Sequence, residues 1–153
     1  MGTRSNLIIA DDYNRLQLYR HYDGYPDSVT GVLADLEKAF PYAWPLPRFE
    51  ADDFAAAIIR AWKGEDGGNI YIDGAPKGWE QIHGDVEWVY IIQPRAERKK
   101  NGPSKFTGKP EVAVYDWHPY WFEKADPEKI KPKPISRIAL AQAKEEGLGW
   151  TNT

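Results

Sequence analysis

The stretch TRSNLIIADDYNRLQLYRHYDGYP, residues 3–26, decides the fold class of this chain. Residues 3–10 hold a run of aliphatic side chains that is typical of a β-strand. Residues 15–22 place leucines at alternate positions, which is the period of a strand with one face toward a core. Residues 11–14, Asp-Asp-Tyr-Asn, have side chains that favour a tight turn. Together they predict an antiparallel hairpin, which Asp-Gly-Tyr-Pro at residues 23–26 brings to an end.

Downstream of the hairpin, the hydrophobic spacing predicts two amphipathic helices and then three strands. Asp and Ser suit the position that caps the first helix, and a proline ends that helix. The expected elements are a helix from Asp27 or Ser28 to Phe40, a helix over residues 51–63, strands over residues 69–73, 86–93 and 111–117, and a loop over residues 95–109 between the last two strands.

This order of elements, β-β-α-α-β-β-β, predicts an α+β fold in which an antiparallel sheet of about five strands carries both helices on one face. Residues 1–118 form a single domain in this prediction, which agrees with a chain length of 153 residues. Residues 119–153 are rich in proline and lysine, a composition that favours an extended arm. A short helix over residues 136–146 is expected to close the chain.

The overall composition limits the classes of function. A formal net charge of −3 is too small for a nucleic-acid mimic and has the wrong sign for a typical DNA-binding protein, so nucleic acid is not an expected partner. The chain has no cysteine, which excludes disulfides, a thiol nucleophile and cysteine-ligated zinc. No apolar run approaches a membrane span and no signal-peptide core is present, so we expect no membrane partner and a cytoplasmic location.

Chargeable side chains gather at one end of the expected hairpin. Arg4 lies early in the first strand and Arg20 late in the second, so antiparallel pairing brings both to the same end. Two guanidinium groups beside an imidazole would suit a phosphate or a carboxylate. The alternative is that both arginines pair with neighbouring acids and brace the hairpin. The candidate ligand-binding residues are Arg4, Ser5, Asn6, Arg20, His21, Asp23 and Tyr25.

Two His–Asp pairs form a second candidate site. His21 and Asp23 follow one expected strand, Asp116 and His118 end another, and the i, i+2 spacing puts the members of each pair on one face. Neighbouring strand ends would let these four side chains hold a divalent metal or act as a general acid and base. Such spacings are frequent by chance, so no metal or other cofactor is assigned. Nucleotide-binding glycine loops, nucleophile elbows and zinc-protease motifs are absent from the sequence.

Two further segments are candidates for contact with a partner chain. An apolar group stands where the arm leaves the domain and could cover a sheet edge or bind another chain. A basic group belongs to the expected loop over residues 95–109, for which an acidic partner and a solvated loop are the two interpretations. The candidate partner-binding residues are Trp117, Tyr120, Trp121 and Phe122 in the apolar group and Arg98, Lys99 and Lys100 in the basic group.

Two blocks of the N-terminal quarter, Gly-Thr-Arg-Ser-Asn at residues 2–6 and Tyr-Arg-His-Tyr-Asp-Gly-Tyr-Pro at residues 19–26, resemble a group of small uncharacterised proteins of bacteriophages and prophages. Those proteins share a Gly-Thr-Arg-Ser start and an aromatic-rich Asp-Gly-Tyr-Pro turn that leads into a helix. The resemblance implies a phage-encoded accessory protein, and it carries no assigned activity. An action on host defence or host metabolism follows by analogy with other small phage proteins.

The first hypothesis for function is therefore a non-enzymatic binding protein that acts in the host cytoplasm on a host protein or complex, for example as an inhibitor of a CRISPR effector. An alternative is a nucleotide-binding protein that sequesters its ligand, or a phosphodiester-processing enzyme, with Arg4, Arg20 and His21 at the site. A metal-dependent enzyme at the two His–Asp pairs ranks last. An enzymatic function thus ranks below a binding function.

Overall fold

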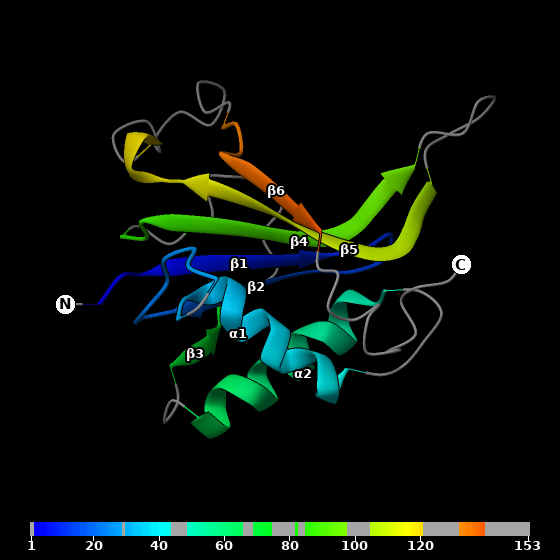
Figure 1. The fold of residues 1–153 in the computed structure, drawn as a ribbon, viewed down its shortest axis with the longest axis horizontal. Helices are drawn as coiled ribbons and strands as arrows, with labels where there is room; N and C mark the ends of the chain where they lie inside the picture. The colour runs from blue at the N-terminus through cyan, green and yellow to red at the C-terminus, as the bar shows by residue number, and fades with distance from the viewer. Residues whose placement is uncertain are drawn as a thin grey trace.

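The structure is a mixed β-sheet with two α-helices on one face. In the part of the chain that the structure describes, six strands pair in the order β3-β2-β1-β4-β5-β6, and α1 and α2 cover the same side (Figure 1). The α+β fold is confirmed, and the sheet has one strand more than the sequence predicts. The computed structural model describes residues 2–28, 30–43, 49–65, 69–74, 82, 85–97, 105–120 and 132–139.

The helices and strands follow the predicted order. Their bounds are β1 Ser5–Ala10, β2 Arg15–Arg20, α1 Val32–Ala39, η1 Phe40–Tyr42, α2 Ala51–Glu65, β3 Ile70–Ile72, β4 Trp88–Glu97, β5 Lys105–Asp116, η3 His118–Tyr120 and β6 Ser136–Ala139. Neither α-helix in this described part is long and apolar enough to cross a membrane.

The predicted hairpin forms, with β1 and β2 antiparallel and Ser5 opposite Arg20. Asp11 makes the turn, because its carboxylate accepts hydrogen bonds from the backbone N–H groups of Tyr13 and Asn14, both at 2.7 Å. β1 also pairs with β4, and these two strands run parallel. The sheet is therefore mixed rather than wholly antiparallel, although the other neighbouring strands are antiparallel.

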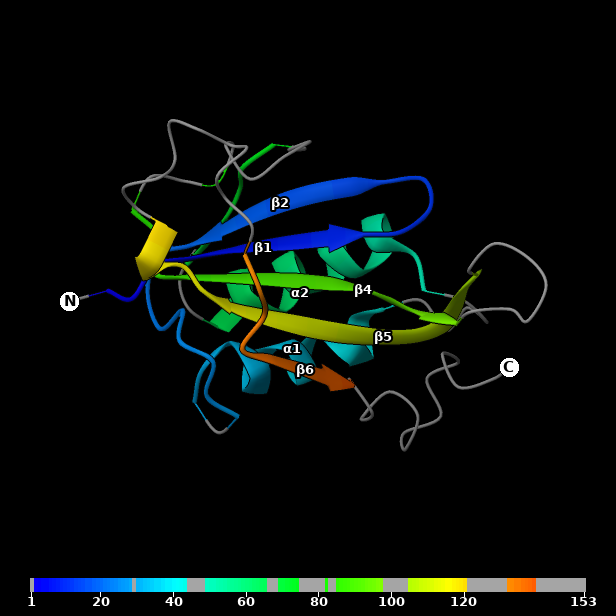
Figure 2. The ribbon, with the colours of Figure 1, turned by 90° about the horizontal axis from the view of Figure 1, so that it is seen from above.

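Both faces of β1 are buried because a hydrophobic cluster lies on each side of the sheet. Leu7 and Ile9 belong to the larger cluster, under α1 and α2. Ile8 belongs to a smaller cluster on the opposite face, where Ile82 and Trp117 also pack. Figure 2 shows the sheet with the helices behind it. The N-terminus and η3 lie at the same end of the sheet in that view.

The first helix begins later than predicted. The backbone of Gly31 is extended, with φ −101° and ψ −156°, so α1 starts at Val32 rather than at Asp27 or Ser28. Asp27 instead caps a turn, since its carboxylate accepts a hydrogen bond from the backbone N–H of Thr30 at 3.0 Å.

Two expectations for the second half of the chain are wrong in part. Residues 95–109 are not all loop, because β4 and β5 continue past a register shift at Pro94 and pair again, with Ala96 opposite Phe106. Residues 136–139 do not begin a helix; they form β6, which pairs with β5. The rest of the expected C-terminal helix, residues 140–146, lies outside the described residues.

The helix-side core makes a prediction about stability. Leu36 of α1 is fully buried in the larger cluster. Leu36→Ala should lower the free energy of unfolding by about 2–5 kcal/mol, because it removes apolar contacts and leaves a cavity. Urea denaturation followed by circular dichroism measures this change. Glu37→Ala, at the exposed neighbouring position, should stay within about 0.5 kcal/mol. Equal losses in the two variants would contradict the assigned helix face.

Candidate functional site

The two arginines of the N-terminal blocks lie at the same end of the hairpin but on opposite faces of the sheet. Arg20 is directly opposite Ser5, so the two share the face that α1 and α2 cover. Arg4 is one residue away from Ser5 and forms an ion pair with Asp85, with Nε 3.2 Å from Oδ2. The expectation that two guanidinium groups form one anion site is therefore wrong.

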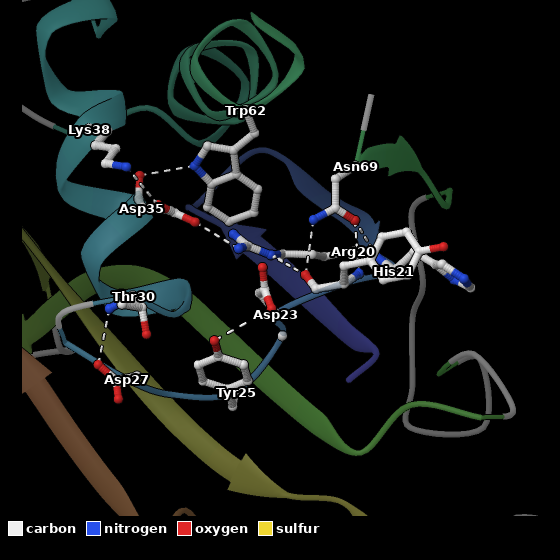
Figure 3. Close-up of polar contacts among 12 residues, drawn as sticks. Arg20, His21, Asp23, Tyr25, Asp27, Thr30, Asp35, Lys38, Trp62 and Asn69 are labelled. Carbon is white, nitrogen blue, oxygen red and sulfur yellow. Dashed lines mark hydrogen bonds and ion pairs between the residues drawn. The ribbon is translucent and has the colours of Figure 1, made fainter. Parts of the chain in front are cut away.

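Arg20 is a core residue, with only 1% of its surface exposed. Its Nη2 lies 2.7 Å from Oδ2 of Asp35, and its Cζ lies 4.6 Å from the centre of the Trp62 ring (Figure 3). Trp62 also donates its ring N–H to the backbone oxygen of Asp35 at 2.9 Å. These contacts join β2 to both helices. Arg20 cannot reach a ligand in solvent, and it has the bracing role that was the alternative.

The backbone after β2 is held by two side chains on the helix face. The carbonyl of Tyr22 accepts hydrogen bonds from Nε of Arg20 at 2.8 Å and from Nδ2 of Asn69 at 2.9 Å. Asn69 also accepts from the N–H groups of His21 and Tyr22 through its Oδ1. Asp23 then has a left-handed backbone with φ 55°, a conformation that Asp tolerates better than most residues.

Gly24 completes this turn by a close approach to β1. A Cβ at this position would lie 2.6 Å from the carbonyl of Thr3 and 2.7 Å from the hydroxyl of Ser5, so only glycine fits. The Gly24 carbonyl accepts a hydrogen bond from the buried hydroxyl of Tyr90 at 2.6 Å. Burial raises the pKa of Tyr90, which keeps this donor protonated.

Four other candidate ligand-binding residues, Ser5, Asn6, Asp23 and Tyr25, lie outside the pocket described below. Ser5 and Asn6 are fully buried, and Asn6 donates to the backbone oxygen of Leu18 and to Asp73. Asp23 and Tyr25 bond each other across the turn, with Tyr25 donating at 3.4 Å (Figure 3).

A pocket of about 660 Å³ opens at the start of β1, on the side of Arg4. Its volume is within the range of small-molecule sites. Arg4 and His21 are the predicted site residues that it brings together, and Glu87 faces them from the segment before β4. Glu87 is placed there by the parallel pairing of β1 and β4, since its backbone N–H donates to the Arg4 carbonyl at 2.9 Å. The lining residues are Gly2, Thr3, Arg4, His21, Tyr22 and Glu87.

Tyr19 connects two of the pocket residues. Its hydroxyl lies 2.9 Å from Nδ1 of His21, and Arg4 works against the rise in its pKa. Burial and the nearby charge of Asp85 raise the pKa of Tyr19, so its hydroxyl is protonated at neutral pH.

A line of four rings, here named the aromatic row, runs from β3 to the pocket. Tyr71 is followed by Tyr19 at a centroid distance of 6.2 Å, by His21 at a further 5.9 Å and by Tyr22 at a further 4.6 Å. Tyr71 and Tyr22, at the two ends, are 52% and 54% exposed. Aromatic residues make up 14% of the sequence, but only the pairing of β2 with β3 brings Tyr71 beside Tyr19.

His118 bridges two carboxylates at the edge of the pocket. Its Nδ1 lies 2.6 Å from Oδ1 of Asp116, and its Nε2 lies 3.4 Å from Oε1 of Glu87. The hydrogen bond to Asp116 raises the pKa of the His118 imidazole, Glu87 adds to that increase, and partial burial opposes it. His118 therefore keeps its positive charge to a higher pH than an isolated histidine does.

The structure does not bring together the four side chains of the two His–Asp pairs, which were the lowest-ranked candidate site. Asp116 and His118 do meet, but His21 and Asp23 make their contacts elsewhere, with Tyr19 and Tyr25. Among the residues that the structure describes, no group of three or more His, Asp or Glu side chains is arranged to hold a metal ion.

The predicted partner-binding residues have different outcomes. Trp117 is fully buried in the smaller cluster, so it does not present an apolar surface to another chain. The sequence could not show this, because the residues that bury Trp117 are distant in the chain. Tyr120 ends η3. Trp121, Phe122, Arg98, Lys99 and Lys100 lie outside the described residues.

No family model, curated protein or solved structure that was compared with the chain matches it. The phage-protein resemblance of the two N-terminal blocks stays a prediction. A function for this chain is therefore inferred from the geometry of its own residues.

Breaking the buried ion pair should be costly. Asp35→Ala leaves the Arg20 guanidinium buried without its carboxylate, and we expect a loss of about 3–5 kcal/mol in the free energy of unfolding. Because both groups act together, Arg20→Met combined with Asp35→Ala should cost at least about 1 kcal/mol less than the sum of the two single changes. Urea denaturation of the four proteins at neutral pH gives this cycle.

Lys38→Ala is the matched control for that cycle. Lys38 contacts the same carboxylate, with Nζ 3.3 Å from Oδ1 of Asp35, but its side chain is half exposed. Its removal should change stability by less than about 1 kcal/mol. A loss for Asp35→Ala as small as that for Lys38→Ala would show that Arg20 does not depend on its carboxylate.

The His118 bridge predicts a pH dependence. Because the pKa of His118 is raised on folding, its stabilisation is complete below the ordinary histidine value of about 6.5 and is lost as pH rises through the folded value. His118→Gln should therefore be less stable than the wild type at about pH 5.5, and this difference should shrink toward about pH 9. Lys38→Ala should show a constant difference over the same range. A His118→Gln difference that grows with pH would contradict the bridge.

Proposed function

We propose that this protein is a non-enzymatic binding protein and that the pocket and the aromatic row form its binding surface. The observation that carries the proposal is the row itself, which leads from exposed Tyr71 to exposed Tyr22 at the pocket rim. Tyrosine is enriched at interfaces because one ring supplies a large apolar area and a polar tip at low entropic cost.

The position of Arg20 favours binding over phosphodiester chemistry. The enzymatic alternative requires Arg4, Arg20 and His21 to act on one substrate. Arg20 instead contacts Asp35 and Trp62 on the helix face, while Arg4 and His21 line the pocket on the other face. The geometry therefore does not favour a catalytic site made of Arg4, Arg20 and His21.

The partner in this proposal is a host protein or complex, met in the host cytoplasm. This part rests on the resemblance of the N-terminal blocks to small phage and prophage proteins. Inhibition of a host defence complex, such as a CRISPR effector, is the role that the resemblance favours by analogy.

The aromatic row should carry most of the binding energy. A Tyr22→Ala and Tyr71→Ala double variant should capture about tenfold less of the partner than the wild type, or less still. The reason is that exposed aromatic side chains often contribute most of the binding energy of an interface. The measurement is affinity capture from host lysate with quantitative mass spectrometry, followed by titration of the purified partner. Folding of each variant is checked by circular dichroism.

Tyr13→Ala is the matched control for this experiment. Tyr13 is 75% exposed, but it lies in the β1–β2 turn at the other end of the hairpin. Its removal should leave the captured amount unchanged. Equal capture by the wild type and the double variant would rule out the aromatic row as the binding surface.

A further inference from the structure

Arg4, Tyr19 and His21 form a chain of neighbouring polar groups, in which the Tyr19 hydroxyl lies 2.9 Å from Nδ1 of His21 and Arg4 works against the rise in the Tyr19 pKa. The direction of this chain that suits a ligand is the one in which the Tyr19 hydroxyl donates to Nδ1. An imidazole that accepts at Nδ1 carries its own hydrogen at Nε2.

His21 and Arg4 both line the pocket, and each retains a donor for a ligand. Arg4 pairs with Asp85 through its Nε, and a guanidinium has four further N–H donors. His21 is contacted through Nδ1, its backbone and its ring face, and no described residue contacts its Nε2. Charged and neutral N–H donors that converge in this way are typical of sites for phosphate oxygens.

The rest of the pocket wall supplies a ring and an acceptor. Tyr22 is half exposed, and its ring meets His21 edge to face at 84°. Base–aromatic stacking contributes about 1–3 kcal/mol per base. Glu87 presents carboxylate oxygens that accept from hydroxyl or amine groups. His118 contacts both Glu87 and Asp116, and when it is protonated it offsets one of these two negative charges.

We propose that the pocket binds a nucleoside monophosphate, with the phosphate on Arg4 and Nε2–H of His21, and the base against Tyr22. Tyr19 is the positioning residue, because its hydrogen bond selects the His21 tautomer that donates. The inference goes beyond the proposed function, because it assigns the pocket a small-molecule ligand in addition to the host protein that is proposed as the partner of the aromatic row. The volume of about 660 Å³ accommodates a ligand of this size.

Isothermal titration of the full chain tests this proposal with four probes: AMP, UMP, adenosine and inorganic phosphate. We expect AMP and UMP each to bind at least about tenfold more tightly than adenosine or inorganic phosphate, because only a nucleotide uses the donors and the ring together. Arg4→Gln should weaken AMP binding by about tenfold or more, since it removes a charge-assisted contact. Tyr13→Phe, far from the pocket, should change nothing.

Each other outcome overturns a defined part of the proposal. Inorganic phosphate that binds as tightly as AMP would remove the base from the site. No detectable binding of any probe would remove the ligand altogether. That result would leave the proposed function standing if partner capture still depends on Tyr22 and Tyr71, so the two failures are distinguishable.

The role of Tyr19 has its own readout. Nitrogen-15 NMR of the histidine rings at about pH 8 should show His21 with its hydrogen on Nε2, and Tyr19→Phe should change this tautomer balance. His21→Gln assigns the signal, since the chain has three histidines. A His21 ring with its hydrogen on Nδ1 in the wild type would contradict the direction of the chain. Unchanged AMP affinity in Tyr19→Phe would contradict the positioning role of Tyr19.

Discussion

The ion pair between Arg20 and Asp35 is the interaction on which the rest of the structure depends. A guanidinium and a carboxylate taken out of water are each costly, and only close pairing with further hydrogen bonds offsets that cost. Here the two groups lie 2.7 Å apart, beside the ring of Trp62. These side chains come from β2, α1 and α2, so this cluster joins both helices to the hairpin.

The same arginine connects the core to the pocket. Its Nε holds the carbonyl of Tyr22 at the point where the chain leaves β2, and Asn69 holds the same carbonyl from β3's side. His21 and Tyr22 are thereby kept at the pocket rim by contacts made on the helix face. Arg20 therefore supports a binding surface that it does not touch, which explains why one sequence block contains both core and surface residues.

Two of the six pocket-lining residues, Arg4 and His21, were predicted from the sequence. They were identifiable because antiparallel pairing of the first two strands brings the chargeable groups of residues 4 and 21 to the same end of the hairpin. Glu87 could not be identified, because it reaches the pocket only through the parallel pairing of β1 with β4, which leaves no local pattern. Trp117 was assigned to a surface because an aromatic residue at a strand end has the same sequence pattern whether it is covered or exposed.

By itself, the sequence determined the β1–β2 hairpin, the second helix and the α+β class, since alternation, helical spacing and turn chemistry act between residues close in the chain. Tertiary structure decided the pairing of Arg20 with Asp35, the strand β6 at residues 136–139 and the composition of the pocket. Each of these depends on which distant backbone pairs with which strand, and a shift of one residue moves every side chain of a strand to the other face. That choice is made by burial of the whole core, and a short window of sequence does not contain it.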